Sequence, residues 1–187
     1  MQVRLDKRAR IIADGGQAYP VDLLRDHTLV QVRQKYTDDT GELTLAPGEE
    51  TTDEVTVGGR VVFVRNTGKL CFASLQDGFT ETSNGERLQI MLSKAEVGDE
   101  SLAAWKSDVD LGDHVWVRGR VVVSRRGELS IMAAEWRMAS KALRPLPTLH
   151  KELSEESRVR RRYADLVVRE ESRQMVRTRA VITRAVR

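Results

Sequence analysis

The sequence predicts a mainly β protein with flanking α-helices, built around a five-stranded barrel. Three observations lead to this fold class. Five segments between residues 54 and 138 alternate apolar and polar side chains with the period of two that is typical of half-buried strands. A helical pattern interrupts these segments between the third and the fourth. Apolar residues at helical spacing return near both ends of the chain.

The N-terminal part, residues 1–53, is expected to form a helical extension and a loop. Apolar residues at helical spacing predict a helix over residues 2–14 with a basic face, and the pair Gly15-Gly16 ends it. Thr28 is a candidate N-cap for a second short helix. Acidic residues, Gly, Thr and Pro dominate residues 37–53, so a loop is expected there.

The barrel is expected over residues 54–140. Its strands are predicted, in chain order, at residues 54–66, 69–77, 86–93, 113–124 and 128–138. The connection 94–110 has a helical pattern and follows the third strand, where an OB fold usually has its helix, so the arrangement predicts an OB-fold β-barrel. Gly58-Gly59 lies inside the first strand, where a strongly bent strand needs a bulge or a close backbone approach.

The chain changes character after the predicted barrel. Two prolines in residues 141–153 favour an extended linker. Ser154 is placed to begin a helix, and the acidic residues after it suit the positive end of the helix dipole. No Gly, Asn or Pro ends the last helical pattern, so residues 154–187 are expected to begin a further domain of a longer protein.

The composition is that of a globular chain from a reducing compartment. No apolar run approaches the ~18 residues of a membrane span, and the start of the chain lacks the apolar stretch of a secretory signal. Cys71 is the only cysteine, which excludes an internal disulfide bond and a cysteine-based zinc site. A cytoplasmic protein without a membrane partner and without a metal held by its own side chains is therefore expected. The net charge of +3 alone is weak support for a nucleic-acid partner.

Alternation separates the two faces of each predicted strand, and Phe72 lies on the outer face of the second strand. The core face of that strand consists of Cys71, Ala73 and Leu75. Polar side chains share the face of Phe72 or emerge beside it on the third strand: Ser74, Gln76, Arg87 and Gln89. An aromatic ring beside amides and cations suits single-stranded RNA, because the ring stacks on an unpaired base for ~1–3 kcal/mol. Ordinary hydrophobic closure of the barrel mouth is the alternative role for Phe72.

Two further features are open to a functional and a structural interpretation. Glu128 follows a tight turn, and its acceptor-only carboxylate suits the amino or imino donors of a base. An exposed turn glutamate without a ligand is the alternative. Arginines and lysines gather near both ends of the chain, where they either contact a polyanion or form solvated helix faces. Cys71, on the core face, is interpreted as a small buried apolar residue rather than a nucleophile.

Several segments resemble class II lysyl-tRNA synthetases of the bacterial kind. They are VGGRVVFVRNTGKLCFASLQD, RLQIML, DVDLGDHVWVRGRVVVSRRGELS and KALRPLPTLHKELSEESRVRRRYADL. The resemblance implies that Phe72 stacks on the central anticodon base and that Arg65, Gln89 and Glu128 recognise the uridine-rich lysine anticodon. It also implies that the N-terminal helix lies beside the anticodon stem, where its cations would hold phosphates. These cations are Arg4, Lys7 and Arg8.

The same resemblance implies the activity of a longer enzyme. That enzyme would use ATP and Mg²⁺ to attach lysine to tRNA-Lys, and it would be a homodimer. Residues from Glu170 onward resemble the long helix of class II motif 1, whereas motifs 2 and 3 are absent. This portion is therefore expected to contain no catalytic residue and to bind the anticodon. The loop at 78–86 is longer than usual for the family, which puts the fine placement of Gln89 in doubt.

Two alternative functions stay open. One is the synthetase module of a fusion protein that forms lysyl-phosphatidylglycerol; such a protein carries a membrane region ahead of the module, and Met1 followed by a basic helix argues against it. The other is a stand-alone OB module that binds single-stranded nucleic acid without specificity. The open-ended helical pattern near Arg187 argues against the second alternative.

Overall fold

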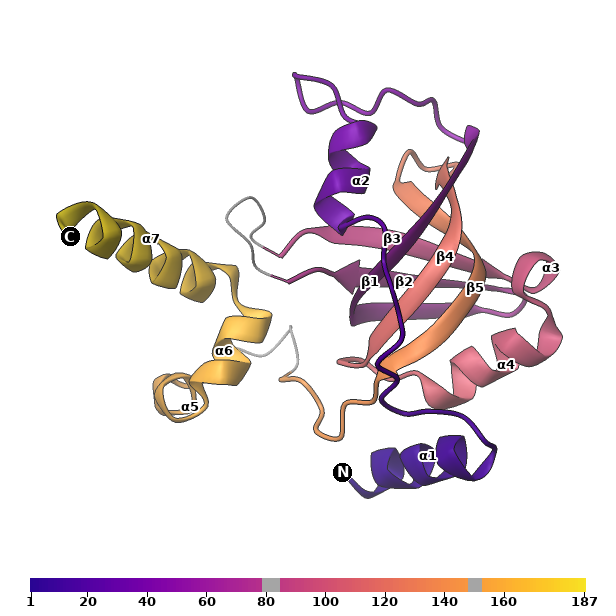
Figure 1. Ribbon diagram of the computed structural model, residues 1–187, viewed down its shortest axis with the longest axis horizontal. Coiled ribbons are helices and arrows are strands. Elements are labelled where there is room, and N and C mark those ends of the chain that lie inside the picture. Colours follow the sequence, from indigo (N-terminus) through magenta and orange to yellow (C-terminus); the bar gives the residue numbers. More distant parts are fainter. Residues whose placement is uncertain (79–84, 148–152) are drawn as a thin grey trace.

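The computed structural model describes residues 1–78, 85–147 and 153–187. Its centre is a closed barrel in which the strands follow the order β1-β2-β3-β5-β4. The strands are β1 (Glu50–Thr67), β2 (Leu70–Gln76), β3 (Arg87–Ser93), β4 (His114–Val123) and β5 (Leu129–Ser140) (Figure 1). The five-stranded OB-fold barrel expected from the alternation is thus confirmed.

Strand β1 is shared between two neighbours because it bends in the middle. Its first half pairs with β4 and its second half with β2, and Arg60 pairs with both. The close approach of β2 favours a glycine at position 59, since a Cβ there would lie 3.0 Å from the carbonyl oxygen of Gln76. A register shift follows between Val61 and Phe63. The close approach expected at Gly58-Gly59 is therefore present, and the bulge lies a little further along the strand.

The barrel interior contains the side chains that alternation placed there. The inward residues of β2 are at most 1% exposed: Cys71, Ala73 and Leu75. Trp105 packs against this core, and its ring meets that of Trp136 edge to face with 5.1 Å between centroids. Gln76 differs from expectation, because it lies on the outer face of β2 and is nevertheless buried, with its amide directed at the carbonyl oxygen of Gly85.

Helices precede the barrel strands in the sequence, lie between β3 and β4, and follow β5. Those in the described residues are α1 (Gln2–Ala13), α2 (Leu29–Lys35), α3 (Lys94–Val97), α4 (Asp99–Asp108), α5 (Glu155–Arg160), α6 (Arg162–Val168) and α7 (Glu170–Val186). Thr28 caps α2 as expected: its hydroxyl accepts the backbone N–H of Gln31, and the Gln31 side chain accepts the backbone N–H of Thr28. This reciprocal capping box satisfies two backbone donors at the start of the helix.

Two elements differ from the sequence-based prediction. The helical pattern over residues 94–110 forms two helices, because Gly98 adopts a φ of +82° that breaks the run. Strand β1 begins at Glu50, inside the stretch expected to be a loop. Its polar start is held to β4 by the pairing of Glu50 with Val122 and by a 2.8 Å hydrogen bond from the Thr51 hydroxyl to the carbonyl of Val121.

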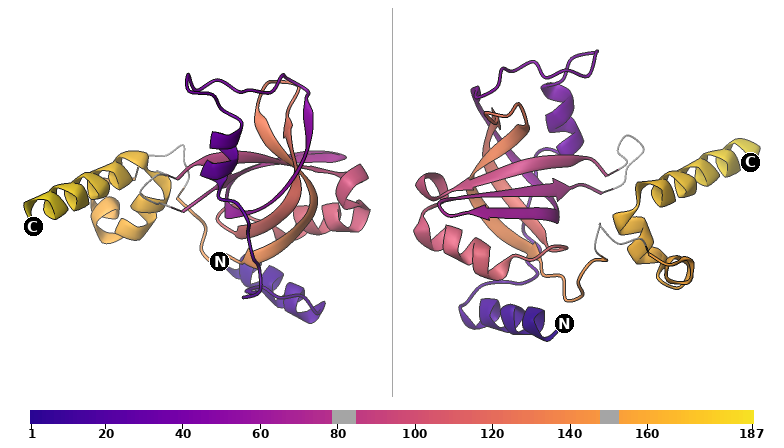
Figure 2. Two further views of the ribbon diagram at one scale, coloured as in Figure 1. Left: turned by 45° about the horizontal axis from the view of Figure 1, so that its top comes forward. Right: turned by 180° about the vertical axis from the view of Figure 1, so that it is seen from behind.

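The helices leave one side of the barrel open. Helices α1 and α4 lie at one end, whereas α5 to α7 extend away from the barrel (Figure 1). In the view from behind, none of the described helices lies in front of β2 and β3 (Figure 2). No described helix is both long and apolar enough to cross a bilayer. The effect expected of the loop at 78–86 falls mostly on residues 79–84, which lie outside the described residues.

Candidate nucleic-acid interface

Arg65 and Phe72 form the centre of the open face. They are direct neighbours across the β1–β2 pair, and the guanidinium carbon of Arg65 lies 4.8 Å from the centre of the Phe72 ring. At this distance the cation is attracted by the negative face of the ring. Phe72 is half-buried on the outer side of the sheet, while its chain neighbours Cys71 and Ala73 fill the interior. The ring is thus placed on the ligand-accessible side of β2.

Strand β3 continues this face beyond Phe72. Met91 is directly opposite Phe72, and Gln89 is the next residue of β3 on the same face. The side-chain amide of Gln89 donates a 2.8 Å hydrogen bond to the hydroxyl of Ser130, its neighbour on β5. Within the described part of the chain, the side-chain carbonyl oxygen of Gln89 accepts no hydrogen bond. The amide is therefore held in place and still offers an acceptor to a ligand.

Glu128 lies at the end of the same row of contacts. The hydroxyl of Ser130 donates to the Glu128 backbone carbonyl at 2.9 Å, and the Glu128 backbone N–H donates to the Ser124 hydroxyl at 3.0 Å. Gly127, with a φ of +82°, provides the turn that brings Ser124 and Glu128 together. The backbone of Glu128 is thus fixed, whereas its side chain is exposed.

The structure brings together all four residues for which the sequence suggested base recognition. Arg65 contacts Phe72, Phe72 neighbours β3, and Gln89 connects through Ser130 to Glu128. The row crosses β1, β2, β3 and β5 on the side that the right-hand view of Figure 2 shows free of described helices. We call this row, together with Met91, the open face.

The charges of the open face differ from those on the adjoining outer surface of β4. There, Arg120 bridges Glu50 at 3.1 Å and Glu96 at 2.8 Å. Hydrogen bonds from Arg120 hold the pKa of the Glu96 carboxyl below its ordinary value. In the part of the chain that the structure describes, neither Arg65 nor Glu128 has an ion-pair partner. Their charges are therefore available to a ligand.

The three cations of α1 have partners within the chain. Arg4 donates to the backbone carbonyls of Leu111 at 2.8 Å and of Ala142 at 3.0 Å. Lys7 forms a 2.8 Å salt bridge with Asp110, and the Arg8 guanidinium carbon lies 5.6 Å from the centre of the Tyr19 ring. Although α1 has no buried residue, the contacts of Arg4 and Lys7 help to attach it to the barrel, together with the ion pair between Arg10 and Asp108 and the packing of Ile11 against the core.

Lys141 was not expected from the sequence to matter, and it lies at the centre of a buried charge cluster. Its ammonium donates to Asp110 at 2.6 Å, to Asp113 at 2.7 Å and to the backbone carbonyl of Asp108 at 2.6 Å. The side chains of Lys141 and Asp113 are both 0% exposed. We call Lys7, Asp110, Asp113 and Lys141 the basal cluster. Hydrogen bonds from Lys141 and Lys7 lower the pKa of Asp110, although burial alone would raise it.

The remaining titratable candidates are structural. Cys71 is fully buried, and burial raises the pKa of its thiol, as expected for a small core residue. His114 stands on β4 beside the basal cluster; burial, followed by the charge of Arg60, lowers its pKa from 6.5 to about 4. In the described ranges, no group of three or more His, Cys, Asp or Glu side chains is arranged to hold a metal ion.

Comparison with known families defines the class of protein. Residues 55–139 match the family of OB-fold nucleic acid binding domains. The matched region begins in the first half of β1 and ends in β5, so it includes all the strands that carry the open face. The chain therefore contains a nucleic-acid-binding OB domain.

Comparison with individual proteins extends over the whole chain. The chain is 58% identical to the lysine–tRNA ligase of Kineococcus radiotolerans and 55% identical to that of Mycolicibacterium gilvum. In each case 100% of this chain is covered, and it spans 35% of the length of the relative. The chain corresponds to the N-terminal OB-fold portion of bacterial lysyl-tRNA synthetases. It is also 36% identical to a lysylphosphatidylglycerol biosynthesis bifunctional protein of Rhodococcus jostii, of which it spans 15%.

Proposed function

We propose that this chain is the part of a lysine–tRNA ligase that selects tRNA-Lys by its anticodon. The observation that supports this most directly is the open face, which carries a half-buried ring, an amide oxygen without a donor and two charges without an ion-pair partner among the described residues. These groups follow one another across β1, β2, β3 and the turn before β5. This combination suits unpaired bases, which offer a flat ring for stacking and polar edges for hydrogen bonds.

Phe72 is the stacking residue of this proposal. The Arg65 guanidinium covers the Phe72 ring in the free protein, and an arriving base takes that place on the ring. The displaced guanidinium keeps its charge and its planar set of donors, which suit the carbonyl oxygens of a uracil. Stacking of one base on an aromatic ring contributes roughly 1–3 kcal/mol. Phe72 is therefore expected to make the largest single contribution to the binding free energy.

Gln89 and Glu128 are the discriminating residues. Gln89, fixed by Ser130, offers its carbonyl oxygen to a base edge, and Glu128 accepts from an imino or amino group. A base with an acceptor at the same place would face the carboxylate without a hydrogen bond. Such a mismatch leaves polar groups unpaired, at a cost of about 1–3 kcal/mol each.

The phosphate contacts implied for Arg4, Lys7 and Arg8 stay a prediction. Each of these side chains already has a partner within the chain, so a phosphate would have to share the cation or displace that partner. Binding of phosphates by cations is sensitive to salt, which provides a measurement that separates the two roles.

The chemistry of the proposed ligase lies outside the described residues. The complete enzyme would bind ATP, Mg²⁺ and lysine in the cytoplasm, and α7 would contribute to a homodimer interface. We assign neither Mg²⁺ nor ATP to any of the described residues. The contribution of this chain is recognition of the tRNA, not catalysis.

The test is titration of a labelled lysine anticodon stem-loop, followed by fluorescence anisotropy. Phe72→Ala and Glu128→Gln should each weaken binding about tenfold or more, because each removes a contact of about 1.4 kcal/mol or more. Arg177→Ala on α7 is the matched control and should leave the affinity unchanged. An aspartate anticodon loop should bind more weakly than the lysine loop. Wild-type affinity in both Phe72→Ala and Glu128→Gln, or equal affinities for the two loops, would contradict the proposal.

A second candidate function is supported by the similarity to the Rhodococcus jostii protein. In that case the complete protein would also transfer lysine to phosphatidylglycerol. The higher identity to the lysine–tRNA ligases favours the first proposal. Incubation of the complete gene product with labelled lysine, tRNA and phosphatidylglycerol vesicles separates the two: labelled tRNA without labelled lipid is expected, and labelled lipid would establish the second function.

A further inference from the structure

Phe63 is the most exposed large apolar side chain in the described barrel residues, 50–78 and 85–140, with 53% of its surface accessible. It stands in the second half of β1, two residues before Arg65. An exposed aromatic ring in the middle of a strand loses the burial that stabilises most phenylalanines, so its presence requires an explanation.

The register shift in β1 determines which way Phe63 points. Val57 and Val61 lie in the core, so uninterrupted alternation would also direct Phe63 inward. The extra residue between Val61 and Phe63 reverses the alternation, and Val64 becomes the inward residue, opposite Ala73 of the core. The bulge therefore turns Phe63 to the outside of the barrel.

The pairing of β1 with β2 places Phe63 on the open face. Phe63 is opposite Ser74, and Arg65 is opposite Phe72, so the two phenylalanines are diagonal neighbours on one surface. Diagonal neighbours in an antiparallel pair are about 7–8 Å apart, which aromatic side chains can bridge. Ser74, which is opposite Phe63, has a small side chain, and the Phe63 side chain itself is exposed.

We propose that Phe63 is a second stacking platform, which binds the nucleobase adjacent to the one on Phe72. This inference rests on the proposed function and adds one nucleotide to the bound segment of single-stranded RNA. Arg65 lies between the two rings in the register and has no carboxylate partner in the described ranges. Its guanidinium is placed to contact the RNA phosphate that joins the two bases.

The chemistry at this position favours RNA over an apolar protein partner. A docking surface for a protein needs a contiguous apolar patch, whereas the residues that flank Phe63 on the face are Ser74 and the charged Arg65. A single ring bordered by a hydroxyl and a cation is instead the equipment for one base and its phosphate.

The test uses three substitutions of Phe63 and the lysine anticodon stem-loop. Phe63→Ala removes the ring, Phe63→Leu keeps an apolar side chain without a ring, and Phe63→Tyr keeps the ring. We expect Ala and Leu to weaken binding roughly 5- to 100-fold and Tyr to bind like the wild type, because stacking needs the π-face. Urea unfolding of each variant verifies that the barrel is intact.

Stem-loops with one abasic nucleotide locate the base. At one loop position, next to the position that responds to Phe72, removal of the base should abolish the difference between Phe63→Ala and wild type. If the Phe63→Ala loss is the same with every abasic loop, or if Leu binds like wild type, Phe63 does not stack on a base and the inference is wrong.

The Phe72→Ala variant in the same series separates the inference from the function on which it rests. Loss with Phe72→Ala and none with Phe63→Ala would refute the second platform and leave anticodon binding intact. Unchanged binding in both variants would refute the two together.

Discussion

The open face and the basal cluster are both rich in polar side chains, yet they use charge in opposite ways. In the basal cluster, Lys141 is surrounded by three oxygen acceptors of its own chain, and its ammonium is fully buried. On the open face, Arg65 contacts the Phe72 ring and has no ion-pair partner among the residues that the structure describes. A charge that already has partners stabilises the fold, whereas a charge without them is available to a ligand.

The same difference between paired and unpaired charges separates the cations of α1 from Arg65 of the open face. Lys7 is directed at Asp110, so its contact fixes α1 to the end of the barrel. Arg65, on the surface of β1, contacts the neighbouring strand β2 through Phe72 and, within the described ranges, forms no ion pair that would attach another element. Predictions that remove one charge from each region therefore test whether the distinction holds.

The largest effect on stability is expected from Lys141→Met. This substitution leaves the fully buried carboxylate of Asp113 without its cation, and removing one partner of a buried pair costs about 3–5 kcal/mol. Urea unfolding measures the loss. Adding Asp113→Asn should recover part of it, because the double variant no longer buries an unpaired charge.

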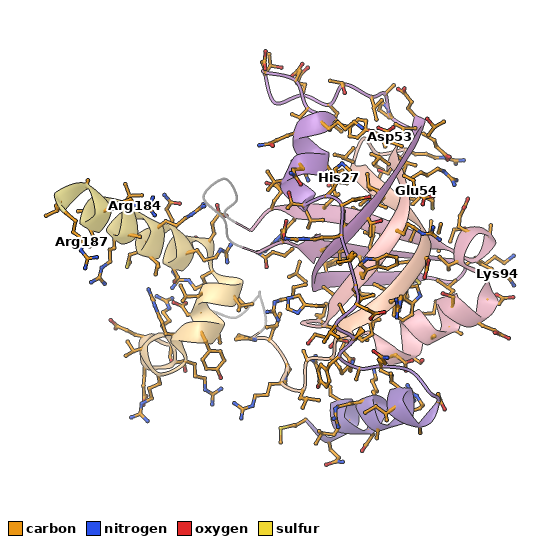
Figure 3. The ribbon with its side chains drawn as sticks, viewed as in Figure 1. His27, Asp53, Glu54, Lys94, Arg184 and Arg187 are labelled. Carbon is orange, nitrogen blue, oxygen red and sulfur yellow. The ribbon has the colours of Figure 1, made fainter. Side chains whose placement is uncertain are left out.

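Lys94→Met is the matched control for this measurement. Lys94 lies at the outer edge of α3 and pairs at 2.5 Å with Asp99 (Figure 3). An exposed ion pair contributes less than about 1 kcal/mol, so the change should be small. Similar losses in Lys94→Met and Lys141→Met would mean that the basal cluster contributes no more than an ordinary surface pair.

A smaller effect is expected in the salt dependence of RNA binding. Arg65→Gln should reduce the slope of log affinity against log salt concentration by about one, because the Arg65 guanidinium, besides its contact with a uracil, no longer neutralises the phosphate between the two bases. Lys7→Gln should leave the slope unchanged and lower the free energy of unfolding, since its partner is Asp110. An equal reduction of the slope in Lys7→Gln would show that α1 contacts phosphates, as the family resemblance implies.

A separate effect is the pH dependence of stability associated with His114. Burial and Arg60 lower the pKa of this histidine to about 4, so it stays neutral in the folded chain while an unfolded chain takes up a proton near pH 6.5. The free energy of unfolding should therefore fall as the pH drops from about 7 towards 4. The slope should correspond to the uptake of less than one proton on unfolding. Urea unfolding of His114→Asn over this range should show a shallower fall than wild type, and parallel curves would exclude the contribution of His114.

The parts of the fold that were predictable depend on local patterns. Alternation identified the core face of β2 from Cys71 to Leu75, and Thr28 identified the start of α2. The residues of the candidate face came from the same alternation combined with a family resemblance. Alternation was sufficient to separate the two faces of β2 and β3 because these strands pair with each other without a register shift.

Other features depend on contacts between distant residues. A lysine is normally exposed, and nothing near Lys141 in the sequence indicates that Asp110 and Asp113 will surround it. The outward direction of Phe63 depends on a bulge that alternation cannot reveal, because the extra residue changes the count. The partners of Arg4 and Lys7, Leu111 and Asp110, are likewise about a hundred residues away in the chain, and charge spacing alone could not identify them.

The parallel ladder between β3 and β5 is the shortest seam of the barrel, with pairing at Gln89, Ile90 and Met91 opposite Ser130, Ile131 and Met132. Short ladders open locally before long ones, so amide hydrogens along this seam are the barrel positions from which exchange with solvent is easiest. An RNA held by Phe72 on one side and Glu128 on the other spans the seam. Its binding would hold β3 and β5 together and slow hydrogen exchange along this ladder.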